Sequence, residues 1–156
     1  MFIFGCFFRQ NKVRIELFVI FIINNNVRKR KNQLLSTLNE LSSDKKTKFS
    51  ETDFWTNTSG IGVKGDELCF FRKEEAHPIQ EVINLNDVKK CSLVQFDKHG
   101  NVPKNNHEIN KLALHLTLSN HKEINLVFFH ADAVNFIIGE EFRIAKKWQD
   151  IITSKI

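Results

Sequence analysis

The histidines are the side chains in this sequence best suited to acid–base or metal chemistry, but their spacing supports neither. There is no H-E-x-x-H, no H-x-x-x-H and no cysteine at zinc-ligand spacing from a histidine. His130-Ala131-Asp132 places an imidazole and a carboxylate on one side of a predicted strand end, a pair that chance also produces. We interpret all six histidines as solvated or structural: His77, His99, His107, His115, His121 and His130.

The cysteines do not form a redox or metal motif. Cys6, Cys69 and Cys91 lie far apart, with no C-x-x-C pair. A sparse, odd number of cysteines argues against a secreted disulfide framework and for a reducing compartment. Cys69 and Cys91 fall in strand-like runs, where we expect them to act as small buried apolar residues.

The other motifs that could carry catalysis are incomplete. Gly60-Ile61-Gly62 lacks the third glycine and the following helix of a phosphate-binding loop. No Walker motif and no G-x-S-x-G is present. The carboxylate pairs Glu74-Glu75 and Glu140-Glu141 are adjacent in sequence and read as solvated surface. We therefore predict no catalytic residue, no metal site and no cofactor.

Charge is divided unevenly along the 156 residues, a length that suits one domain with an appendage. The net charge of +5 arises from ten Lys/Arg against three Asp/Glu in residues 1–50, and thirteen against fifteen in residues 51–156. The two parts therefore carry +7 and −2. A nucleic-acid-binding domain is expected to have a basic face, so the balance argues against a nucleic-acid partner.

The N-terminal segment, residues 1–27, is apolar and could anchor the chain to a membrane. Two apolar patches, Met1–Phe8 and Leu17–Ile23, are separated by charged residues, and neither alone reaches the roughly 20 residues of a spanning helix. Three interpretations stay open: an imperfect anchor, a packed N-terminal strand or helix, and a poorly defined start of the chain. The membrane-proximal basic run follows: Arg28, Lys29, Arg30 and Lys31.

Residues 28–50 are predicted to form a basic amphipathic helix or stalk. The helical pattern covers Lys29–Ser43, in which four leucines recur at i, i+1, i+4 and i+7 on one face. Such a helix could lift the following domain off a surface, or it could pack on a sheet. The leucines are Leu34, Leu35, Leu38 and Leu41.

From Ile61 onward the hydrophobic period changes to two, which predicts antiparallel strands. Lys64-Gly65-Asp66 supplies a turn before the returning strand Leu68–Phe71, and Lys90–Phe96 forms a later strand. The clearest alternation is in Lys111–Leu118, which a short turn joins to an apolar alternation at Ile124, Leu126 and Phe128. Residues 51–156 are thus predicted to form a mainly β (α+β) domain.

The C-terminal segment, Glu140 to about Lys155, is predicted to be an amphipathic helix that covers the sheet. We place Ile144 and Ile151 at the margins of its buried stripe. Phe54 and Trp55 could form an exposed aromatic patch, but an edge-of-core role is the favoured interpretation. The predicted structural core combines strand and helix residues: Leu112, Leu114, Leu116, Phe142, Ala145, Trp148 and Ile152.

A run of strands closed by one C-terminal helix with a central tryptophan resembles the pleckstrin-homology-like (PH-like) fold. The likeness covers about Phe54 to Ile156, rests on element order and on Glu141–Ile152, and implies an antiparallel sandwich or partly open barrel capped by the helix. The whole chain is also similar to small uncharacterised bacterial proteins that join an N-terminal membrane helix and a Lys/Arg run to such a domain. The matching features are Arg28–Lys31, Asp53–Asn57, Ile61-Gly62-Val63 and Ala145–Ile152.

Lipid-binding members of the PH family use a lysine early in the first hairpin and a later basic-x-Arg triplet. Lys64 matches the first position, but no basic-x-Arg follows it, and Asp66 and Glu67 flank it. We therefore expect a non-catalytic binding or scaffolding module at the cytoplasmic side of a membrane, recognising a protein or peptide through a sheet edge or barrel end. The alternatives are a soluble cytoplasmic protein, and a small enzyme or ligand-binding barrel whose site forms only in three dimensions. The oligomeric state stays open.

Overall fold

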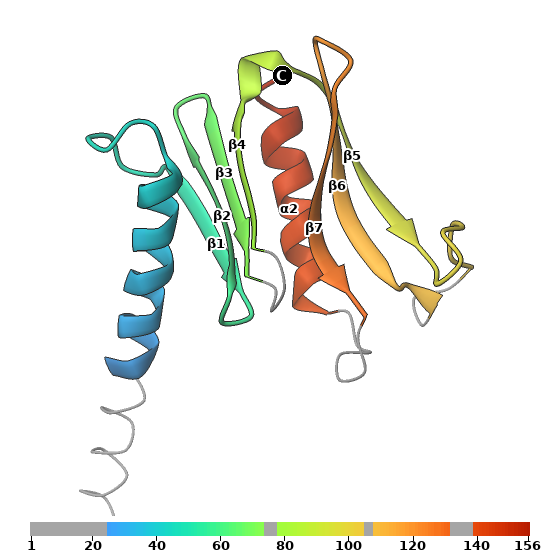
Figure 1. Cartoon of the computed structure of the whole chain (residues 1–156), viewed down its shortest axis with the longest axis horizontal. Helices are drawn as coiled ribbons and strands as arrows, with labels where there is room; N and C mark the ends of the chain where they lie inside the picture. The colour runs from blue at the N-terminus through green and yellow to red at the C-terminus, as the bar shows by residue number, and fades with distance from the viewer. Residues whose placement is uncertain (1–24, 74–77, 105–107, 132–138) are drawn as a thin grey trace, which may run out of the picture.

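The computed structural model describes residues 25–73, 78–104, 108–131 and 139–156 (Figure 1). A helix over residues 25–41 comes first, then seven strands and a C-terminal helix. The predicted mainly β class, with one helix before the strands and one after them in the chain, is confirmed. The elements are β1 (Glu51–Trp55), β2 (Ser59–Lys64), β3 (Glu67–Arg72), β4 (Ile79–Asn84), the 3₁₀ turn η1 (Leu85–Asp87), β5 (Val88–Phe96), β6 (Lys111–Leu118), β7 (Glu123–His130) and α2 (Glu140–Thr153).

The strands form two antiparallel sheets with neighbours in sequence order. One sheet has the order β1-β2-β3-β4 and the other β5-β6-β7, and η1 connects them. Gly65 sits in the β2–β3 turn at φ +57°, as the predicted Lys64-Gly65-Asp66 turn requires. The predicted hairpin is confirmed as β6 and β7, paired from Lys111↔His130 to Thr117↔Glu123 with one irregularity after Leu112.

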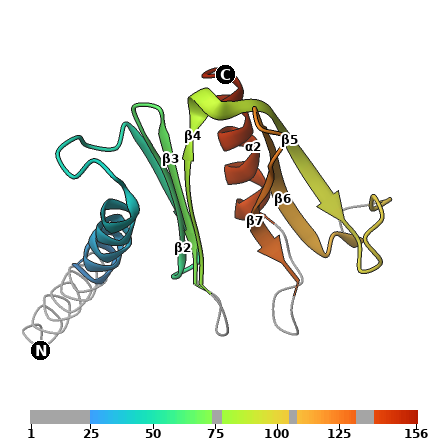
Figure 2. The same ribbon diagram turned by 45° about the horizontal axis from the view of Figure 1, so that its top comes forward.

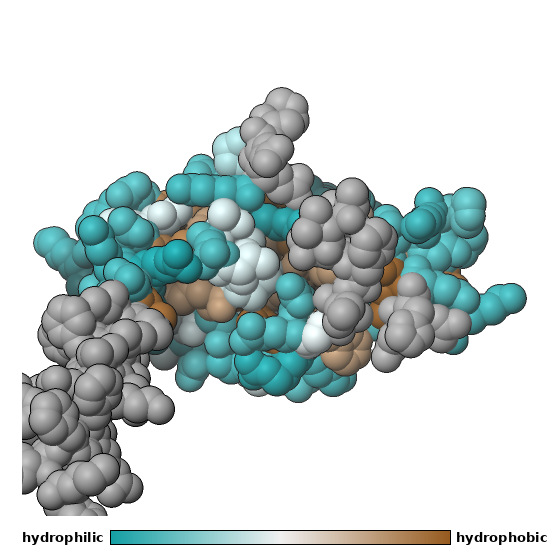
Figure 3. All heavy atoms as spheres, turned by 90° about the horizontal axis from the view of Figure 1, so that it is seen from below, coloured by the Kyte–Doolittle hydropathy of each residue, from teal (hydrophilic) through white to brown (hydrophobic). Residues whose placement is uncertain are grey.

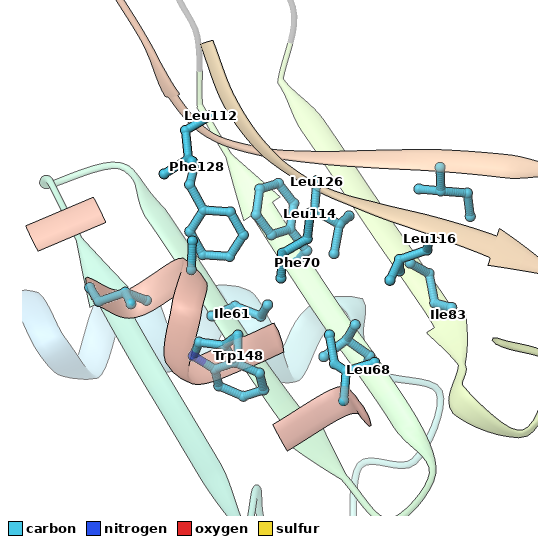
Figure 4. Close-up of a cluster of buried hydrophobic side chains, with 14 of the residues drawn as sticks. Ile61, Leu68, Phe70, Ile83, Leu112, Leu114, Leu116, Leu126, Phe128 and Trp148 are labelled. Atoms are coloured by element: carbon cyan, nitrogen blue, oxygen red, sulfur yellow. The ribbon is translucent and has the colours of Figure 1, made fainter. Parts of the chain in front are cut away.

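One hydrophobic core fills the space between the inner faces of the two sheets and α2 (Figure 4). Trp55 on β1 is 2% exposed, stacks on Phe128 of β7 at 4.6 Å between ring centroids, and donates its indole N–H to the Phe128 carbonyl at 3.0 Å. This residue therefore joins the sheets, which confirms a core role over an exposed aromatic patch. Leu112, Leu114 and Leu116 are fully buried in the same cluster.

Helix α2 inserts a stripe of four buried residues into this core: Ile144, Ala145, Trp148 and Ile152. The expected place of Phe142 in the stripe is wrong, because its side chain is 38% exposed, whereas Ile144, expected at the margin, is 1% exposed. At ~100° of rotation per residue, the stripe centres between Trp148 and Ile152, and Phe142 lies about 105° from that centre. Lys155 lies beyond the last turn rather than within it.

The helix over residues 25–41 packs on the outer face of the four-stranded sheet, opposite α2 (Figures 1 and 2). Leu38 is fully buried against Cys69 and Phe71 of β3. Of the two roles open to this segment, packing on the sheet is the one observed. Partly buried residues from the helix and from the chain that follows it pack around this cluster: Leu34, Leu41, Phe49 and Phe54.

Two glycines of β2 make this close packing possible. A Cβ on Gly60 would lie 2.6 Å from the Phe54 ring, and one on Gly62 would lie 2.8 Å from the Phe49 ring and 3.1 Å from Leu38. The G-x-G sequence therefore admits aromatic rings and a helix onto the sheet.

The predicted apolar anchor falls mostly on residues 1–24, which lie outside the described residues. Among the residues that the structure describes, no helix combines the length and the apolar character that a membrane crossing needs.

Candidate functional site

Docking of the N-terminal helix divides the basic run into two pairs. Arg28, Lys29, Arg30 and Lys31 are all exposed. Arg30 and Lys31 lie on the side of the helix that faces the sheet, together with Val27 and Leu34, in an i, i+3, i+4, i+7 pattern. Arg28 and Lys29 are not among the residues that line this side. The structure thus separates four side chains that the sequence presents as one cluster.

A groove runs between this helix and the β1–β2 turn. It has two lobes, of about 360 Å³ and about 410 Å³, which share Arg30, Leu34 and Asn57. Arg30 Nη1 donates to Asn57 Oδ1 at 3.2 Å, so this hydrogen bond spans the groove between its lobes. Seen from below, this end of the molecule is mostly hydrophilic at its rim, with hydrophobic residues visible further in (Figure 3). We refer to the two lobes together as the basic groove.

The strand side of the groove is held in place by the end of β3. The backbone N–H of Lys73 donates to the carbonyl of Thr58 at 2.9 Å, which fixes Lys73 beside the β1–β2 turn. Thr56 in that turn adopts φ +55°, a conformation unfavourable for a β-branched residue. Its hydroxyl contacts the Ser59 hydroxyl at 3.2 Å. Lys73 lines the larger lobe with Arg30, although 43 residues separate them in sequence.

Asp53, the one carboxylate among the described residues that line the groove, is already paired. Asp53 Oδ2 accepts hydrogen bonds from Lys147 Nζ at 2.7 Å and from Trp148 Nε1 at 2.8 Å. The hydrogen bond to Asp53 raises the pKa of Lys147 above its usual value, with burial opposing it and the charges of Asp53 and Glu51 adding to it. Asp53 therefore ties β1 to α2, and the positive charges of Arg30, Lys31 and Lys73 face the groove without a competing free acid among the described residues lining it.

Lys64 does not occupy the role that the resemblance implies. It is 4% exposed, its ammonium donates to the Asp44 carbonyl at 2.5 Å, and it lies 4.7 Å from the centre of the Phe49 ring. The loop over residues 42–50 thus folds over Lys64 and buries its ammonium group. A second surface hollow of about 540 Å³ beside this hairpin is lined by acids as well as by Lys64, including Asp66 and Glu67.

The described cysteines are poor nucleophiles. Burial raises the pKa of the Cys69 thiol to about 12, with the Glu67 carboxylate adding to the shift, and burial raises that of Cys91 to about 11. Both thiols therefore stay protonated near neutral pH. Cys69 is buried as predicted, whereas Cys91 is only half-buried.

The histidines are not gathered into a site within the described residues. His115 hydrogen-bonds Asn125 at 3.0 Å and lies 3.7 Å from a Glu123 carboxylate oxygen. His130 is exposed, and Asp132, its proposed partner, lies outside the described residues. No group of three His, Cys, Asp or Glu side chains suited to a metal ion occurs in the part of the chain that the structure describes.

A further hollow of about 460 Å³ lies beside the β5–β6 loop and includes Asp97, His99 and Glu108. The Asp97 carboxylate accepts backbone hydrogen bonds from His99 and Asn101, each at 2.8 Å. These bonds, that from Asn101 foremost, hold the pKa of Asp97 below its usual value. Asp97 is thus occupied in shaping its own loop.

Comparisons with family models, with curated proteins and with solved structures find no match to this chain. The candidate site therefore rests on its own geometry. Sequence reasoning identified the basic run but missed Asn57 and Lys73. The i, i+3, i+4 spacing of Val27, Arg30 and Lys31 was the one signal that could have divided the run.

Proposed function

We propose that this protein is a non-catalytic, PH-like binding module held at an anionic membrane surface with its folded domain in the cytoplasm. One observation carries the proposal: four exposed cations sit in the first turns of a helix whose later part is packed onto the domain through Leu38. Their position relative to the domain is therefore fixed. In sequence, the apolar run Leu17–Ile23 precedes them, with four residues in between.

The expected strength follows from the charge. A basic residue near an anionic membrane contributes about 1 kcal/mol, so four together contribute up to about 4 kcal/mol, or roughly a thousandfold in partition. This electrostatic attraction alone is too weak for permanent attachment to the membrane. Combined with an apolar segment it gives stable association, as two-signal anchoring requires.

The arrangement of two antiparallel sheets with sequential strands and a C-terminal helix supports a PH-like fold, and free strand edges support recognition of a protein or peptide. Among the described strands, β5 pairs only with β6, and residues 91–96 on it carry no charge. An uncharged edge of this length lacks the lysines and prolines that usually block pairing with an added strand.

The test is co-sedimentation of the full-length chain with vesicles of phosphatidylcholine, alone or mixed with an equal amount of phosphatidylglycerol. The parent should prefer the anionic vesicles. Replacing Arg28, Lys29, Arg30 and Lys31 by Gln should lower that preference by up to about a thousandfold.

A matched control removes the same charge from the other sheet and its loops by replacing Lys89, Lys90, Lys98 and Lys122, all exposed, by Gln. The control should retain the parent's preference. Equal losses in the two variants, or no preference in the parent, would refute the proposal.

A further inference from the structure

We propose that the basic groove is a binding site for a phosphate group, held between Arg30 of the N-terminal helix and Lys73 at the end of β3, with Lys31 in the adjoining lobe. The inference rests on the proposed function, which it deepens by naming the ligand chemistry. It differs from a general attraction to anionic surfaces because it assigns unequal roles to neighbouring cations.

The donors of the groove suit a phosphate. A guanidinium has five N–H groups, and with the described residues Arg30 makes one side-chain hydrogen bond, to Asn57. Among the described residues, no carboxylate forms an ion pair with Arg30, Lys31 or Lys73. The larger lobe has no acid among its described lining residues and adds the polar side chains of Gln33 and Thr37. Guanidinium and ammonium groups that converge from two walls match the several acceptor oxygens of a phosphate.

Both walls of the groove are held in place by the rest of the fold. Its helix wall is fixed by the burial of Leu38, and its strand wall by the backbone hydrogen bond from Lys73 to Thr58. Because Asp53 Oδ2 accepts hydrogen bonds from Lys147 and Trp148, the charge of this lining acid is already paired with a cation outside the groove. A preformed site of this kind loses little entropy when an anion binds.

Arg28 is the natural control for Arg30. Both are exposed arginines on one turn of the same helix, so each contributes alike to a diffuse surface charge. Only Arg30 lines the groove. Attraction to charge alone predicts equal effects of Arg28→Gln and Arg30→Gln, whereas a phosphate site predicts unequal ones.

The first arm of the test titrates inorganic phosphate against the full-length chain at constant ionic strength, balanced with chloride, and follows the thermal unfolding midpoint. Phosphate should raise the midpoint of the parent. Arg30→Gln and Lys73→Gln should each weaken phosphate binding about tenfold, the loss expected for one charge-assisted hydrogen bond. Arg28→Gln should change it less than about twofold, a difference too small for one lost hydrogen bond.

The second arm identifies the source of the phosphate, using vesicles that contain phosphatidic acid or phosphatidylglycerol at equal surface charge. Stronger binding to phosphatidic acid that depends on Arg30 assigns a lipid headgroup. Phosphate stabilisation without a preference for phosphatidic acid assigns a soluble phosphate compound.

The two proposals fail in different ways. Equal effects of Arg28→Gln and Arg30→Gln in every assay would overturn the phosphate site while leaving membrane association intact. Absence of any preference for anionic vesicles, with Arg30-dependent stabilisation by phosphate retained, would overturn membrane association and keep the site. No response to phosphate in either arm refutes this inference.

Discussion

Trp148 is the residue on which the junction between α2 and the rest of the domain depends most. Its side chain is fully buried among residues of both sheets (Figure 4), and its indole N–H donates to Asp53 Oδ2 at 2.8 Å. Replacing it by alanine removes the largest side chain of the helix from the core. It also removes the hydrogen bond that, with that of Lys147, holds Asp53.

The expected cost follows from these two losses. Truncating a buried Trp to Ala costs about 3–5 kcal/mol. Losing a hydrogen bond to a charged group costs about 1.5–3 kcal/mol, and this cost is partly offset because Lys147 still holds Asp53. A domain of this size has a total stability of about 5–15 kcal/mol, and 1 kcal/mol shifts its midpoint by about 2–4 °C. Trp148→Ala should therefore lower the midpoint by at least about 6 °C or leave the chain unfolded.

The measurement is thermal and urea unfolding of Trp148→Ala, Trp148→Phe and a control on the same helix, Phe142→Ala. Phe142 is 38% exposed and should cost about 1 kcal/mol or less. Trp148→Phe keeps most of the volume and should fall between the two. Trp55→Ala, which removes a ring stacked on Phe128, should cost about as much as Trp148→Ala. Small, equal shifts for Trp148→Ala and Phe142→Ala would refute the packing of α2 described above.

Three further predictions concern other parts of the fold. The free energy of unfolding of a fragment of residues 50–156 should be at least about 2 kcal/mol lower than that of residues 25–156, because the fragment exposes the surface that Leu38 covers. Equal free energies of unfolding would contradict the helix packing. In a Cys6→Ser chain at pH 8, Cys91 and Cys69 should alkylate roughly 100-fold and 1000-fold more slowly than a free cysteine, since their raised pKa values reduce the thiolate fraction; rapid labelling of the folded chain would show the thiols to be accessible. His121→Gly should stabilise the chain by about 1 kcal/mol, because His121 holds φ +65° in the β6–β7 turn; a loss in urea unfolding would mean that its side chain matters more than its backbone.

Where the hydrophobic period was unambiguous, the sequence was sufficient. The alternation in Lys111–Leu118 predicted β6 with its bounds, and the segment from Glu140 predicted α2 to within two residues. The hydrophobic period and the turn residues are local properties of the sequence. They therefore predict an element without knowledge of the distant residues against which it packs. The phase of α2 was the exception: Phe142 and Ile144 both fit an apolar stripe, and packing against the sheets decided between them.

The candidate site was less predictable because distant segments create it. Gly60 and Gly62 resemble part of a phosphate loop, but their role is set by rings from Phe49 and Phe54. Lys64 was the cation that the resemblance pointed to, and the loop over residues 42–50 buries it. Lys73 and Arg30 meet only after the helix docks, so no local pattern could pair them.

Fractionation of the native cells tests the central claim, membrane association with a cytoplasmic domain, most directly. Membranes are collected at low and at high salt, and the full-length chain is located before and after protease treatment of sealed vesicles of known orientation. The account predicts recovery with the membranes at low salt, with residues 51–156 digested only where the cytoplasmic face is exposed. Recovery of the whole chain in the soluble fraction at low salt, or protection of the domain on the opposite side, would contradict it.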